Sequence, residues 1–121
     1  MLNRKEVHNS ETLNIQIDSH DQKSYLIELS KDCTKFDLNV ECLENSFSKF
    51  FILNHAESAC ELNINMVLKQ DANCQMGVLD LEKSPLKWNH YVDLKEQGAE
   101  YEILSGQLCQ EHIEKVCDME V

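Results

Sequence analysis

The chain has 121 residues, enough for one domain, and 42% of them are hydrophobic, which is typical of a globular protein. Its 22 acidic residues outnumber its 11 basic residues, and the resulting net charge of −11 repels nucleic-acid phosphates and anionic lipid headgroups. We therefore expect neither nucleic acid nor membrane as a partner. Since no apolar run approaches the roughly 20 residues of a membrane helix and the start of the chain lacks a secretory h-region, we expect a cytoplasmic protein.

Residues 1–11 are polar and aperiodic, and we expect them to form a frayed leader or a short cap. From Thr12 onward apolar and polar residues alternate, which is typical of half-buried strands, and short polar turns separate the segments. We expect residues 12–121 to form a single domain, either whole or as a piece of a longer protein. The expected strands cover residues 12–17, 25–29, 36–42, 49–54, 60–68, 74–81, 88–94, 100–108 and 114–121.

The alternation repeats about every 26 residues, with two strands in each period. One column of equivalent positions contains Leu38, Ile64, His90 and Cys117. Such a period predicts coils that bury their apolar side chains only by stacking on one another. The predicted fold is therefore all-β, a flattened right-handed parallel β-helix of about four coils. An antiparallel β-sandwich remains the alternative, because regular strand spacing is common there too.

The stretch from Tyr101 onward fits two patterns. Leu104, Leu108, His112 and Val116 also fit one face of a helix, but Gly106 weakens a helix by about 1 kcal/mol relative to Ala. The repeat covers this stretch, so we predict a strand there.

The stretch "LNINMVLKQDANCQMGVLDLEKSPLKWNHYVDLKEQGAEYEILSGQLCQEHIEKVCDMEV" resembles the SufB/SufD family of iron–sulfur cluster assembly proteins. The likeness lies in an alternating strand, a polar bend and another strand, as in "LKQDANCQMGVL" and "LKEQGAEYEILSG", and in the following "SGQLCQEHIEKVCDMEV". It covers about Phe51 to Val121 and contains no single diagnostic motif. The resemblance implies a β-helical scaffold that pairs with SufB-, SufC- or SufD-like subunits. Full members are several times longer and handle the cluster in later coils, so no cluster ligand can be assigned to a residue of this chain.

Metal chemistry has weak support in the sequence. His90 and Cys117 share a column on adjacent coils and are the weak candidates for metal ligands, but a third ligand is not evident, so we expect core packing and no metal or resident cofactor. An iron–sulfur cluster is conceivable only for a larger parent complex. Cys33 and Cys60 lie 27 positions apart, which predicts neighbouring coils near one turn, although coincidence of spacing is the favoured interpretation. Cys74 begins a strand beside a bend, where we expect an exposed, inert thiol.

Catalytic motifs such as GxSxG, HExxH, the Walker loop and GxGxxG do not occur, and we expect no catalytic residues and no enzyme activity. The predicted function is a non-enzymatic scaffold or interaction domain of the SufB/SufD type. The alternative is a small β-sandwich module that binds a ligand or carbohydrate, which is weakened because Trp88 and Tyr91 alternate to opposite faces. Met119 and Val121 lie in an alternating strand at the C-terminal end, and an open β-helix edge there predicts a homodimer.

Overall fold

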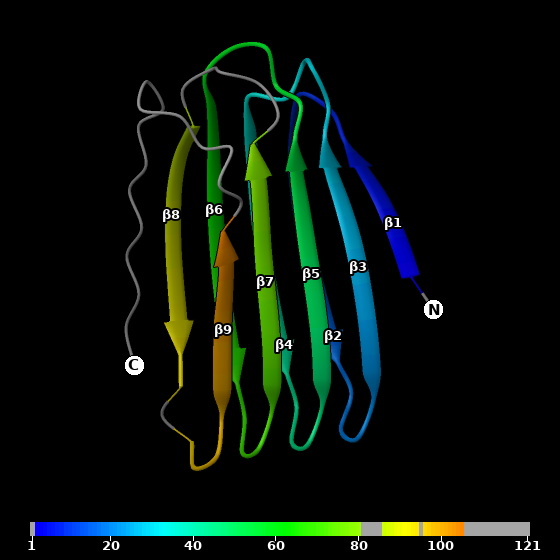
Figure 1. Ribbon diagram of the computed structural model, residues 1–121, viewed down its shortest axis with the longest axis vertical. Helices are drawn as coiled ribbons and strands as arrows, with labels where there is room; N and C mark the ends of the chain where they lie inside the picture. Colours follow the sequence, from blue (N-terminus) through cyan, green and yellow to red (C-terminus); the bar gives the residue numbers. More distant parts are fainter. Residues whose placement is uncertain (1, 81–85, 95, 106–121) are drawn as a thin grey trace.

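The computed structural model describes residues 2–80, 86–94 and 96–105, and these residues form two facing parallel sheets (Figure 1). The chain alternates between the sheets, so that each coil contributes one strand to each. The five-stranded sheet has the order β1-β3-β5-β7-β9 and the four-stranded sheet the order β2-β4-β6-β8. The strands are β1 (Leu2–Val7), β2 (Ser10–Ile17), β3 (Gln22–Leu29), β4 (Lys35–Cys42), β5 (Phe47–Asn54), β6 (Cys60–Leu68), β7 (Asn73–Asp80), β8 (Leu86–Asp93) and β9 (Glu100–Ser105).

The strand pairing confirms the predicted β-solenoid of about four coils. Every pairing between described strands is parallel, and strands that follow one another in sequence lie in different sheets. In Figure 1 one sheet rises in front and the other descends behind as the chain moves from right to left, so the coil is right-handed. The alternative of an antiparallel β-sandwich is wrong, because its hairpins would pair consecutive strands.

The predicted repeat also has the predicted register. Leu38 pairs with Ile64, and Ile64 pairs with His90, so the three side chains form one inward column. Cys117, the fourth member of the predicted column, lies outside the described residues. Because side chains alternate with a period of two, a slip of one residue would turn each strand's apolar set outward, and the pattern of apolar residues therefore specifies the register.

The sequence predicts a frayed leader or a short cap over residues 1–11, and the described part of this segment lies mainly in strands. Residues 2–7 form β1, which pairs with β3, and β2 already begins at Ser10. Few apolar residues are needed here because other contacts hold the segment. Val7 is fully buried, and Lys5 Nζ lies 2.9 Å from Glu11 Oε2. The side-chain amide of Asn3 also donates a hydrogen bond to the backbone oxygen of Ser24 at 3.3 Å.

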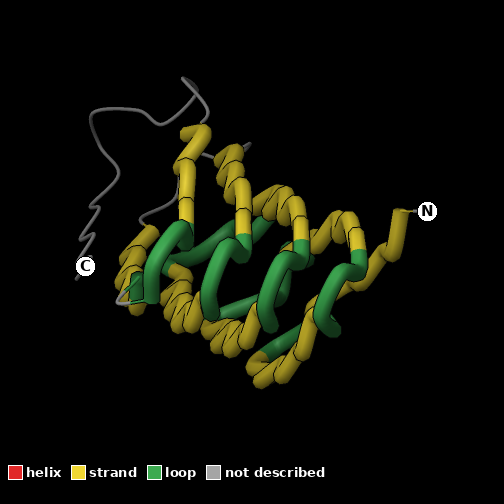
Figure 2. The backbone as a smooth tube through the Cα atoms, turned by 90° about the horizontal axis from the view of Figure 1, so that it is seen from below, coloured by secondary structure: helices red, strands yellow, loops and turns green. Residues whose placement is uncertain are grey.

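One residue in each of four stacked turns has a left-handed backbone. The turns joining the four-stranded sheet back to the five-stranded sheet contain His20, Asn45, Asp71 and Gly98, with φ angles of 63°, 61°, 58° and 79°. Each of the first three is hydrogen-bonded to the equivalent turn of the next coil. The backbone N–H groups of His20, Asn45 and Asp71 donate to the carbonyls of Glu44, Gln70 and Gln97, each at 3.1 Å. Figure 2 shows how the connections of successive coils stack along the solenoid. Repeating the same turn aligns each coil with the one before it.

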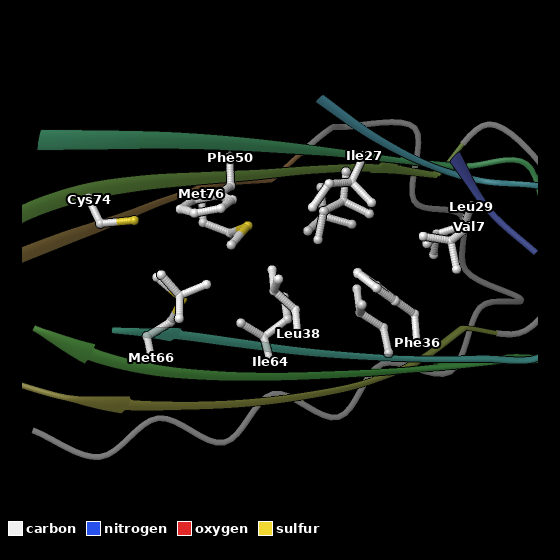
Figure 3. Packing of buried hydrophobic residues seen from close by; sticks show 14 of the residues in the cluster. Val7, Ile27, Leu29, Phe36, Leu38, Phe50, Ile64, Met66, Cys74 and Met76 are labelled. Carbon is white, nitrogen blue, oxygen red and sulfur yellow. The ribbon is translucent and has the colours of Figure 1, made fainter. Parts of the chain in front are cut away.

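The core lies between the two sheets (Figure 3). Phe50 and Met76 reach in from the five-stranded sheet and face Leu38, Ile64 and Met66 from the four-stranded sheet, and all five are at most 1% exposed. Each coil supplies only a thin layer of this core, so burial depends on stacking, as expected of a solenoid. Among the described residues there is no helix of the length and apolar character that crossing a bilayer demands.

Candidate protein-interaction surface

The outer face of the four-stranded sheet is polar and carries rows of amide side chains. Asn14, Asn39 and Asn65 occupy equivalent positions on three successive coils. The Asn39 amide donates to Asn14 Oδ1, and the Asn65 amide donates to Asn39 Oδ1, both at 3.0 Å. The row adds side-chain hydrogen bonds to the backbone bonds between coils and presents a polar surface.

A second amide row borders a shallow hollow on the same face. Asn63 donates to Asp37 Oδ1 at 2.7 Å, and Asn89 donates to Asn63 Oδ1 at 2.8 Å. Together with Tyr91, which is 39% exposed, these residues line a hollow of about 380 Å³. The hollow combines amide groups, one carboxylate and one aromatic ring.

The outer face of the five-stranded sheet differs in its apolar centre. Phe51 is 48% exposed and is flanked in its row by Leu26 on β3 and Gly77 on β7. In the next row, half-buried Leu53 pairs with half-buried Leu79. Leu26, Phe51, Leu53 and Leu79 are called the apolar patch below. Gly77 is buried although it lies on the outer face.

An acidic hollow lies beside the apolar patch on the same sheet. Its volume is about 460 Å³, and Glu100 and Glu102 of β9 line it together with Asn73 and Gln75 of β7. Asn73 donates to Glu100 Oε2 at 3.2 Å, which orients one of the two carboxylates. We refer to this feature as the acidic hollow. Its two carboxylates favour a cationic group of a partner.

The predicted metal candidate His90 lies inside the solenoid. It is 1% exposed, and its Nε2 is hydrogen-bonded to the Tyr101 hydroxyl, with the two rings edge to face at a centroid distance of 5.3 Å. Burial lowers the pKa of His90 to about 4, so the ring is neutral at pH 7. The structure therefore places His90 in the core, as predicted, while Cys117 lies outside the described residues.

The described cysteines form two buried pairs. The sulfur atoms of Cys33 and Cys60 are 3.8 Å apart, so the spacing of 27 residues does place them on neighbouring coils. Cys74 is fully buried, and the expectation of an exposed thiol there is wrong, because its side chain points between the sheets. It shares a hydrogen bond with Cys42, which raises the pKa of the Cys74 thiol, and burial raises it further.

These thiols do not fit an iron–sulfur cluster or a zinc ion. Either group needs three or four convergent ligands, and among the described residues no three His, Cys, Asp or Glu side chains converge in that way. Cys109 and Cys117 lie outside the described residues. The expectation that the chain holds no metal and no resident cofactor therefore stays a prediction.

The apolar patch was missed by sequence reasoning, although a signal was present. In "KFFILN" apolar residues occupy both faces of one strand, because Phe51 and Leu53 alternate with Phe50 and Ile52. A strand with only one buried face would place polar residues at two of these four positions. The excess apolar residues therefore indicated a second apolar surface.

Comparison with known proteins identifies no relative. No protein-family model, curated protein or solved structure matches the chain.

Proposed function

We propose that the protein is a non-enzymatic scaffold that binds a protein partner on the outer face of its five-stranded sheet. The observation that carries the proposal is the apolar patch, centred on the half-exposed Phe51 and continuous across β3, β5 and β7. Apolar side chains gathered on one face mark protein interfaces more often than scattered ones do. Aromatic residues are also enriched among the residues that dominate binding energy.

The charge near the apolar patch favours a partner that carries basic side chains. The acidic hollow with Glu100 and Glu102 lies beside it, and the chain as a whole carries a net charge of −11. The net charge of −11 on each copy opposes self-association. The occupant is therefore a different protein, with an apolar centre that covers Phe51 and Lys or Arg side chains that enter the acidic hollow.

Two single substitutions on opposite faces test the proposal. Phe51→Ala removes the centre of the patch, and Tyr91→Ala removes a similarly exposed aromatic ring from the other sheet. The immobilised wild-type chain and both variants are incubated with lysate of the cells that produce the protein, and mass spectrometry compares the amounts of the proteins that each one retains. We expect the partner to be retained by Tyr91→Ala and lost with Phe51→Ala.

The retained protein is then purified and titrated against the wild-type chain and a Glu100→Lys, Glu102→Lys variant. Rim charges act mainly through long-range attraction, so we expect weaker binding by this variant and weaker wild-type binding at higher salt. Equal binding by wild type and Phe51→Ala, or binding that is indifferent to salt and to both glutamates, would contradict the proposal.

The narrower proposal is that this scaffold belongs to cytoplasmic iron–sulfur cluster assembly. It is supported by the resemblance of residues 51–121 to the SufB/SufD family. Purified SufB, SufC and SufD proteins are mixed in turn with the full chain, and complexes are detected by size-exclusion chromatography with light scattering. A complex that depends on Phe51 supports this proposal. If none of the three binds while another basic partner does, the narrower proposal fails and the scaffold remains.

A second candidate function is saccharide binding at the other face. The hollow lined by Asp37, Asn63, Asn89 and Tyr91 combines hydrogen-bonding groups with an aromatic ring, as sugar sites do. It is the weaker candidate, because Asn63 and Asn89 already use their amides within the row. Titration of the chain with neutral oligosaccharides, followed by amide chemical shifts, tests it. Shifts confined to β6 and β8 and abolished by Tyr91→Ala would favour it over the scaffold.

A further inference from the structure

The four described cysteines are not distributed at random within the fold. All four are buried, and each lies against another cysteine: Cys33 with Cys60, and Cys42 with Cys74. Cys33 lies in the connection between β3 and β4, and Cys60 is the first residue of β6, one coil further along the solenoid. The first pair therefore joins two neighbouring coils at the same edge.

The backbone fixes the approach of this pair. The N–H of Glu61 donates to the carbonyl of Thr34 at 2.9 Å, so the residues adjacent in sequence to the two cysteines are hydrogen-bonded to each other. Cys33 is further held by its own N–H, which donates to the Ser30 carbonyl at 3.0 Å. The pairing of β4 with β6 begins directly after the two cysteines, where Lys35 pairs with Glu61, so Cys33 and Cys60 lie at the same end of two hydrogen-bonded strands.

We propose that Cys33 and Cys60 form a disulfide site that covalently links the second coil of the solenoid to the third when the chain meets a low-molecular-weight disulfide. The two sulfur atoms, 3.8 Å apart, need to approach to about 2.05 Å, which rotation of the side chains can provide. The bridge joins residues 27 positions apart and so closes one whole coil into a covalent ring.

The small disulfide is the oxidant in this reaction. One cysteine of the pair, as its thiolate, attacks the small disulfide and releases one small thiolate, leaving a mixed disulfide on the protein. The second cysteine then attacks the protein sulfur and releases the other small thiolate. The two protons lost by the cysteines are taken up by the two released thiolates. Two protein thiols are oxidised to one disulfide, and one small disulfide is reduced to two thiols.

Burial of the two cysteines favours the uncharged disulfide and slows the thiol–disulfide exchange that forms it. A disulfide is uncharged and suits a site where Cys33 and Cys60 are 0% and 3% exposed, whereas thiolates do not. Burial is also the main cause of the raised pKa of Cys33, which keeps it protonated in the closed solenoid. Exchange therefore proceeds when the coils separate locally or before they stack.

The test uses the full chain unfolded in denaturant and refolded by dilution into either reduced glutathione or its disulfide. Free thiols are alkylated, and cross-linked peptides are mapped by mass spectrometry. We expect the oxidised sample to contain a bridge between Cys33 and Cys60 and to melt roughly 5–15 °C above the reduced sample. Adding a reductant to the folded oxidised protein should return the lower melting temperature.

Matched variants separate this pair from the other. Cys60→Ala should abolish the mapped bridge and the difference in melting temperature between the two buffers, while Cys74→Ala, in the second pair, should preserve both. The wild-type mapping decides the question even if a variant fails to fold. Bridges only to other cysteines, glutathione left as a mixed disulfide on Cys33 or Cys60, or a melting difference that persists in Cys60→Ala would each overturn the proposal.

Discussion

Replacing Phe50 by Ala tests which face of β5 is buried. Phe50 is fully buried, and its ring stacks on Tyr25 with centroids 5.0 Å apart and planes 4° apart. Truncating a buried Phe to Ala costs about 3–5 kcal/mol, because apolar contacts are lost and a cavity remains. The lost ring pair contributes about 0.5–1.5 kcal/mol beyond area burial and favours the upper part of that range. Urea unfolding followed by circular dichroism measures the free energy of unfolding.

The neighbouring Phe51 is the matched control, with the same side chain on the same strand. It points outward and is 48% exposed, so half of the roughly 1.5–3 kcal/mol of full burial gives a cost of about 1 kcal/mol for Phe51→Ala. A one-residue shift of register would exchange the two values. If the two variants lost equal stability, or Phe51→Ala lost more, the assignment of inner and outer faces would be wrong.

Three further predictions concern a buried ring, an amide row and a turn. Burial lowers the pKa of His90 from 6.5 to about 4. On acidification, His90 is therefore protonated near pH 6.5 in the unfolded chain but only near pH 4 in the folded chain. Stability should therefore fall through that window by up to about 3 kcal/mol, and pH-dependent melting of wild type against His90→Asn measures this contribution. Asn39→Ala removes two exposed amide hydrogen bonds and should cost about 1 kcal/mol in urea unfolding, whereas no loss would show that the row adds nothing to coil pairing. Gly98→Ala places a side chain at φ 79° and against the carboxylate of Asp71, so we expect a loss of about 1–3 kcal/mol in thermal melts, and an unchanged melting temperature would contradict the left-handed turn.

The repeat and the register could be predicted because both follow from side-chain alternation. Leu38, Ile64 and His90 share a column since each coil must bury its inward residues against the next, and that requirement is visible as a spacing in the sequence. The two-sheet arrangement follows from two such strands in each period. These predictions needed no knowledge of individual contacts.

The first strand and the outer surface could not be predicted in the same way. In β1 the backbone hydrogen bonds to β3 and the ion pair of Lys5 with Glu11 replace the missing apolar residues, and neither leaves a period in the sequence. Burial of Cys74 depends on where a turn ends, which alternation alone does not fix to one residue. The acidic hollow combines Gln75 and Glu102 from neighbouring coils, and only their register brings them together.

The stacking of coils by parallel pairing also determines how the molecule responds to force. The hydrogen bonds between coils run along the solenoid axis, so a pull on one end of the chain in that direction loads the bonds of the terminal coil before those of the next. The coils are then expected to peel away one at a time, each with its own small resistance. A coil of 26 residues, the spacing from Leu38 to Ile64, releases roughly 90 Å of extended chain. An extension trace should therefore show steps of that length, and a covalent bridge across one coil would remove its step.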